Sequence, residues 1–183
     1  MSKRPGADKT DLAETAAGGA TGTREAASGG YSSPPCFMHE LDPVYLGYLP
    51  ADEVLALLTE LLEAERAGAK GTTALARAAD DPALRAALTE VGRDEARFCA
   101  MLSGHIARLG GEPSRRTGAF YEKLLAVEGA PQRMALLNRG QGWVARKLRD
   151  AVPHIHDDAL REDLRAMLRT HEENIARCTP FAE

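Results

Sequence analysis

The sequence has few cysteines and no long apolar segment, and each shortage excludes a class of protein. Its three cysteines, Cys36, Cys99 and Cys178, lie far apart without a CxxC spacing. This pattern excludes a cysteine-rich metal knuckle, and it suits a reducing compartment better than a disulfide framework. The sequence has no run of about 18 apolar residues for a transmembrane helix, and its N-terminus has no apolar signal core. We therefore expect a cytoplasmic protein without a membrane partner.

Charge of one sign is not concentrated anywhere in the chain. The formal net charge is -4, and basic residues alternate with acidic ones rather than clustering. Binding a phosphate backbone needs clustered lysine and arginine, so we expect no nucleic-acid partner. With 183 residues and 44% hydrophobic content, the chain is long enough for one domain with a sizeable core and too short for two.

The composition divides the chain into a tail, an arm and a domain. Residues 1–33 are rich in Gly, Ala, Ser and Thr, which predicts a disordered tail; a tether that docks on a protein partner is the alternative. Residues 34–49 are rich in apolar side chains, so we expect an extended arm that packs on the domain. Cys36, His39 and Glu40 of this arm form a CxxHE pattern that can bind a metal, although the surrounding prolines favour plain packing.

Residues 50–180 have the apolar periodicity of an all-α domain. Prolines at first helical positions, acidic caps and glycine or proline stops delimit the helices. The predicted long helices span residues 50–79, 82–109, 131–152 and 158–178. Within the long connection at 110–130, Thr117 is expected to cap a short helix that Gly129 terminates. A connection of this length can run along the other helices as a crossover, which predicts an antiparallel four-helix bundle.

One polar residue interrupts the apolar stripe of each predicted long helix. Glu65, Glu95, Gln141 and His171 each lie within a few residues of the middle of their helix. Because an α-helix rises about 1.5 Å per residue, similar depth puts these side chains in one layer. Bundles build metal and cofactor sites in such central layers. A carboxylate placed among leucines must be paired, protonated or bound to a metal.

Six glycines lie within the predicted helices, and each lowers helix stability by about 1 kcal/mol relative to alanine. They are Gly68, Gly71, Gly92, Gly104, Gly140 and Gly142. We expect close packing or a cavity to compensate for this loss.

The segments LLEAERAGA, DEARFCAML, RRTGAFYEK and LNRGQGW resemble an uncharacterised bacterial family of the ferritin-like superfamily. This resemblance covers roughly residues 34–180 and implies an up-down-down-up bundle with the crossover between its second and third helices. Ferritin-like carboxylate proteins bind two irons with a Glu on each of two helices and a Glu-x-x-His on each of the other two. Glu65, Glu95 and His171 match three of these ligand positions.

Other ligand positions of that pattern hold different residues. Phe98 stands where the second-helix His is expected, Gln141 is nearest to the third-helix Glu, and Leu168 replaces the fourth-helix Glu. Two carboxylates and one imidazole can still hold a single Fe, Mn or Zn ion with open positions. The candidate ligands are therefore Glu65, Glu95 and His171, with Gln141 in the same layer.

Three classes of function stay open. The first is a metal-dependent oxidoreductase or metal-handling protein that uses this layer. The second is a non-catalytic scaffold or interaction protein whose buried polar network fixes the helix register without a metal. The third is a hydrolase or transferase with a nucleophilic Cys99, which lacks an evident base. Trp143 and Leu136 lie off the core stripe and add apolar surface, which predicts a homodimer.

Overall fold

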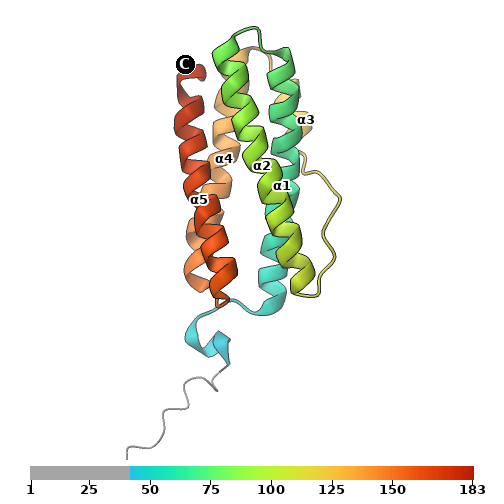
Figure 1. Cartoon of the computed structure of the whole chain (residues 1–183), viewed down its shortest axis with the longest axis vertical. Coiled ribbons are helices and arrows are strands. Elements are labelled where there is room, and N and C mark those ends of the chain that lie inside the picture. The colour runs from blue at the N-terminus through green and yellow to red at the C-terminus, as the bar shows by residue number, and fades with distance from the viewer. Residues whose placement is uncertain (1–41) are drawn as a thin grey trace, which may run out of the picture. The chain divides into compact units, whose positions relative to one another are not determined.

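The computed structural model describes residues 42–183, and all of its regular secondary structure is helical (Figure 1). Its α-helices are α1 (Ala51–Ala78), α2 (Pro82–Arg108), α3 (Phe120–Ala126), α4 (Ala130–Ala151) and α5 (Asp158–Cys178). Short 3-10 turns cover η2 (Pro43–Leu46), η3 (Val152–His154) and η4 (Thr179–Phe181). The all-α prediction is confirmed for this part of the chain. No helix in it is long and apolar enough to cross a membrane.

The long helices α1, α2, α4 and α5 lie side by side (Figure 1). Helix α1 packs mainly on α2 and α4 mainly on α5, while α2 also contacts α5 and α1 contacts α4. The connection between α2 and α4 runs back along the helices and carries α3, which contacts both α1 and α4 (Figure 1). The predicted disordered tail and the CxxHE pattern lie outside the described residues.

Side-chain caps fix two of the helix starts as the sequence predicts. Asp81 accepts a hydrogen bond from the Ala83 amide at 2.9 Å at the start of α2, and Asp157 accepts one from the Leu160 amide at 2.8 Å at the start of α5. The predicted Thr117 cap is wrong, because its hydroxyl instead accepts a hydrogen bond from Lys70 Nζ at 2.9 Å.

The predicted end of the short helix is also wrong. Helix α3 ends at Ala126, and Gly129 is instead the N-cap of α4, with a φ of 84°. A glycine is favoured there because residues that carry a side chain rarely adopt a backbone conformation with positive φ.

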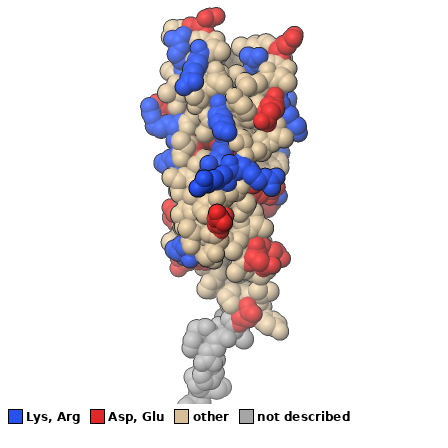
Figure 2. All heavy atoms as spheres, turned by 90° about the vertical axis from the view of Figure 1, so that its right-hand side faces the viewer, with Lys and Arg blue, Asp and Glu red and all other residues tan. Residues whose placement is uncertain are grey.

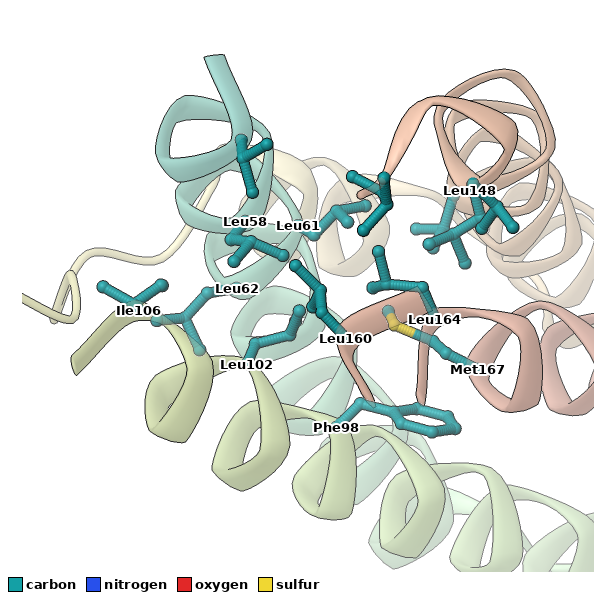
Figure 3. Close-up of a cluster of buried hydrophobic side chains, with 14 residues drawn as sticks. Leu58, Leu61, Leu62, Phe98, Leu102, Ile106, Leu148, Leu160, Leu164 and Met167 are labelled. Carbon is teal, nitrogen blue, oxygen red and sulfur yellow. The ribbon is translucent and has the colours of Figure 1, made fainter. Parts of the chain in front are cut away.

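Buried apolar side chains form two clusters. The first gathers residues of α1, α2, α4 and α5 around Leu58, Leu102 and Leu164, as Figure 3 shows in part. The second includes Leu88 and Met134, together with Leu124 of α3. Along each long helix, the residues of one cluster are separated from those of the other by buried polar residues. The core is therefore two apolar parts with a polar layer between them.

Helix α3 docks where α1 and α4 have no side chain. A Cβ added at Gly71 of α1 would lie 2.6 Å from Leu124 Cδ2, and one added at Gly140 of α4 would lie 2.8 Å from the Phe120 ring. These two glycines follow the predicted rule that close packing compensates for lost helix propensity. Gly104 does not follow it, since a Cβ there would meet nothing within 4 Å.

The end of the predicted arm contacts the turn before α5. The Leu49 amide donates to the His154 carbonyl at 2.9 Å, and the Tyr48 ring meets the His156 ring edge-on at 4.9 Å. Earlier in the arm, Tyr45 leaves 87% of its surface exposed.

These glycines provide a test of how α3 is held. We expect Gly71→Ala to destabilise the protein by about 1–3 kcal/mol, because the fully buried Leu124 must move to admit the methyl group. Gly104→Ala is the matched control, and it should stabilise the protein by about 0.5–1 kcal/mol because its methyl group meets open space. Urea unfolding of both variants measures the difference. Equal stabilisation by the two substitutions would contradict the docking of α3 on Gly71.

Candidate functional site

The structure brings the four polar residues singled out in the sequence into one buried layer. Glu65 of α1, Glu95 of α2, Gln141 of α4 and His171 of α5 each leave at most 4% of their surface exposed. Their helices present them between the two apolar clusters, where their polar groups have little access to water. Such groups need partners within the protein, because a bare buried charge costs several kcal/mol or more.

Gln141 joins a carboxyl group to an imidazole. Its Nε2 donates a hydrogen bond to Glu95 Oε1 at 2.5 Å, and its Oε1 accepts one from His171 Nδ1. On the other side of the ring, His171 Nε2 lies 3.2 Å from Glu65 Oε1. An amide is suited to the central position because it offers a donor and an acceptor at once. The layer is thus a linear series of contacts from Glu95 through Gln141 and His171 to Glu65.

Thr72 extends this series to the α1 backbone. Its hydroxyl lies 2.9 Å from the Gly68 carbonyl and 3.2 Å from Glu95 Oε2. A hydroxyl has a single proton to donate, and the carbonyl is the closer acceptor. A protonated Glu95 satisfies the remaining contact, because its Oε2 then donates to the Thr72 oxygen.

The environment of Glu95 favours this protonated form. Burial raises the pKa of its carboxyl group well above the ordinary value of 4.5, and the nearby Glu65 carboxylate raises it further. Hydrogen bonds donated to the charged carboxylate lower its pKa, and Gln141 donates one; Thr72 would act in the same way only if its proton turned from the Gly68 carbonyl to Glu95.

Two helix glycines make room for these contacts. A Cβ at Gly68 would collide with the Glu95 carboxyl group, and a Cβ at Gly92 would lie 2.8 Å from the Thr72 hydroxyl. Their absent side chains let α1 and α2 approach closely where the layer crosses between them. Thr72 lies seven residues after Glu65, a spacing that puts both on one face of α1, but the sequence alone does not identify it as a partner of Glu95.

Asn174 is a second buried polar residue that sequence reasoning missed. Its amide donates to Asp94 Oδ2 at 3.2 Å, one helical turn from His171. The neighbouring Ile175 is apolar and lies four residues after His171, a spacing that predicts an inward position, but it is only partly buried. The HExN spacing of residues 171–174 puts His171 and Asn174 on one helix face and could have indicated this contact.

Two atoms of the layer lack a hydrogen-bond partner among the described residues. They are Glu65 Oε2 and His171 Nε2, both fully buried. Since His171 Nδ1 carries the proton donated to Gln141, the 3.2 Å approach of Nε2 to Glu65 Oε1 needs a proton or a cation between two acceptors.

The layer does not fit a two-metal centre. No group of three or more His, Cys, Asp or Glu side chains within residues 42–183 is arranged to hold a metal ion. Glu65 and His171 meet, but both oxygens of Glu95 are engaged by Gln141 and Thr72. Phe98 occupies the expected second-helix His position, and its ring stacks on His171 with centroids 5.7 Å apart.

A pocket of about 560 Å³ reaches the layer from the side. Glu65, Glu95 and Gln141 contribute to its lining, and the other lining residues come from α1, α3, α4 and the connection before α3. Figure 2 shows the face of the molecule on the α3 side, where lysine and arginine side chains gather across the middle. The buried layer is therefore in contact with a space that a small molecule can enter.

Among the described residues, His105 and Cys99 were further candidates for chemistry, and neither makes a hydrogen bond to the four residues of the layer. His105 lies ten residues after Glu95, which is nearly three helical turns from the layer, and its Nε2 lies 2.7 Å from Asp163 Oδ2 near the end of α2. Burial raises the pKa of the Cys99 thiol to about 11, with a further contribution from the Glu65 carboxylate. This thiol is therefore protonated at neutral pH, and the thiolate is the nucleophilic form.

Together these features define an all-helical protein with a buried polar layer that borders a side pocket. The chain belongs to the family described as a domain of unknown function, DUF6306, whose model matches residues 52–180. The matched range contains all four residues of the layer. No curated protein matches the sequence.

The raised pKa of Glu95 predicts how stability depends on pH. Above the ordinary value of 4.5 the unfolded carboxyl group loses its proton while the folded one keeps it, so folded stability falls as pH rises toward the folded pKa. Glu95→Gln mimics the protonated group, since its amide can donate to Thr72 and accept from Gln141. We expect its stability relative to the unsubstituted protein to increase with pH, by up to about 1.4 kcal/mol per unit.

Urea unfolding from about pH 5 to about pH 8 measures this difference. Glu90→Gln is the control, because Glu90 lies on the same helix and is exposed beside Arg93. A Glu95→Gln curve parallel to that of the unsubstituted protein would show that the folded state does not hold this proton.

Proposed function

We propose that the protein is a ferritin-like four-helix bundle of the up-down-down-up kind that works without a di-iron centre, as a non-catalytic binding scaffold. Its central layer is a metal-free network that fixes helix register and forms the floor of a binding pocket. The observation that carries this proposal is the series of contacts from Glu95 through Gln141 and His171 to Glu65. Helix packing and the long connection carrying α3 support the ferritin-like topology.

The residues at the missing ligand positions support a network without metal. Phe98 stacks on His171 and covers one face of the ring, and Leu168 packs against the first apolar cluster. Neither side chain can bind a metal. The amide of Gln141 is a weak metal ligand compared with a carboxylate, and both of its ends already make hydrogen bonds.

One metal ion held in the layer is the second candidate function, and a specific observation favours it. Glu65 Oε2 and His171 Nε2 are buried without a hydrogen-bond partner in the described part of the chain. A single Fe, Mn or Zn ion bound to these two atoms, with Glu95 turned toward it, would satisfy both. The protein would then handle a metal or use it for redox chemistry.

A single substitution separates these two candidates. In a metal-free network, Glu65→Gln removes a buried charge and leaves an amide that can donate to His171 Nε2. We expect stability to be unchanged or to rise by on the order of 1 kcal/mol. Adding Fe(II), Mn(II) or Zn(II) should leave the melting temperature unchanged, both for the unsubstituted protein and for Glu65→Gln. Thermal unfolding, combined with metal analysis of protein purified without chelators, measures both effects.

Glu53→Gln is the matched control, because Glu53 is an exposed acid on the same helix. The metal-free proposal would be overturned if the unsubstituted protein held stoichiometric metal and if Glu65→Gln and His171→Ala lost both the metal and stability. That result would establish the second candidate.

The homodimer stays a prediction. Trp143 and Leu136 are partly buried and line the side pocket, while Val44 and Tyr45 are among the exposed large apolar residues. Sedimentation at micromolar concentration should give the mass of two chains. A monomer whose sedimentation is unchanged by Trp143→Ala would remove the prediction.

A further inference from the structure

The side pocket has the size and wall chemistry of a small-molecule site. Its volume of about 560 Å³ lies within the range of about 300–1,000 Å³ that is usual for ligand pockets. Apolar and aromatic side chains provide the wall, among them Phe120, Leu136, Trp143 and Val144. Such a surface binds the flat or aliphatic body of an organic molecule by excluding water and by stacking.

The acidic residues at the pocket rim are already neutralised. Glu60 pairs with Lys147 at 2.9 Å. Glu63 accepts a hydrogen bond from the Ser114 hydroxyl at 2.6 Å and lies 3.8 Å from the Arg116 guanidinium group. Each carboxylate therefore has a partner within the protein and contributes little net negative charge to the opening.

The basic residues at the rim are in the opposite situation. Lys123, Arg139 and Arg146 line the pocket and are exposed. None of the three forms a side-chain hydrogen bond or an ion pair with another described residue. These three cationic groups therefore have no counter-charge among the described residues, and they lie at the opening of the pocket next to an apolar wall.

We propose that this pocket binds a small organic anion, with its acidic group held by Lys123, Arg139 and Arg146 and its apolar body against Phe120, Leu136 and Trp143. Guanidinium groups match carboxylate, phosphate and sulfonate oxygens in pairs, and such charge-assisted hydrogen bonds are stronger than neutral ones. The inference rests on the proposed binding function and names the class of ligand that the pocket takes. It depends on the rim and the wall, and it holds with or without a metal in the layer.

The probe for this proposal is 2-naphthoate, which combines one carboxylate with a flat apolar body. Trp143 is the single tryptophan of the chain, so its fluorescence reports on the pocket directly. We expect saturable binding of 2-naphthoate to the full chain, seen both by calorimetry and by a change in Trp143 fluorescence. The neutral analogue 2-naphthalenemethanol should bind at least about tenfold more weakly, because it lacks the group that the cations hold.

The rim is tested by removing its charge without altering the fold. Arg139→Gln/Arg146→Gln should weaken 2-naphthoate binding by about tenfold or more and leave binding of 2-naphthalenemethanol unchanged. Arg165→Gln/Arg169→Gln is the matched control, because these arginines are exposed on α5, pair with Glu162 and do not line the pocket. It should leave both affinities unchanged.

Three results would overturn the proposal. They are no saturable binding of 2-naphthoate, equal affinity for the acid and the alcohol, and equal weakening by the rim variant and the control variant. Metal analysis of the same preparations reports on the central layer separately, so failure of anion binding is distinguishable from failure of the metal-free proposal.

Discussion

The constraint on which the structure depends is the cost of burying two carboxyl groups between apolar clusters. Glu65 and Glu95 would repel one another and would be poorly solvated if both were charged and unpaired. The raised pKa of Glu95, which favours its neutral form, and the approach of His171 to Glu65 relieve this cost. Gln141 holds the two parts together by donating to Glu95 and accepting from His171. The layer therefore connects α2, α4 and α5 to α1 at one level along the helices. A shift of any helix by one residue would break a contact, which is how a buried polar network specifies register.

Helix α4 illustrates how much of the fold could be predicted from the sequence. Its stripe of Met134, Leu137, Gln141, Val144 and Leu148 is buried as the periodicity predicts. On α2 and α5, the same spacing continued to the helix end predicts that His105 and Ile175 face inward. The structure instead buries Ile106 and Asn174. Steps of three and four residues only approximate the period of 3.6, so a stripe extended over many turns rotates away from the face that packs.

The site could be predicted only as a set of residues at one depth. Which atoms meet depends on the distance between helices, and that distance is set locally by Gly68 and Gly92. The sequence shows that these glycines lower helix propensity, but it does not show which side chains fill the space beside them. Glu95 fills the space at Gly68 and Thr72 the space at Gly92, each from the facing helix. The pocket was not predictable, because it depends on where α3 docks. Phe120 packs on Gly140 of α4, and Leu124 packs on Gly71 of α1. Both contacts join residues that are distant from each other in the sequence.

Gln141 connects these points, because it belongs both to the layer and to the lining of the pocket. A glutamate at this position, as the ferritin-like pattern has, would add a third carboxylate beside Glu95 and would leave His171 Nδ1 facing another charge. Three clustered carboxylates need bound cations to balance them in a dry core. With the amide in place, the layer holds two carboxyl groups, and burial raises the pKa of Glu95 and so favours its neutral form. The proposed loss of di-iron chemistry therefore follows from charge: the substitution that removes a ligand also removes the excess negative charge that would attract the metal.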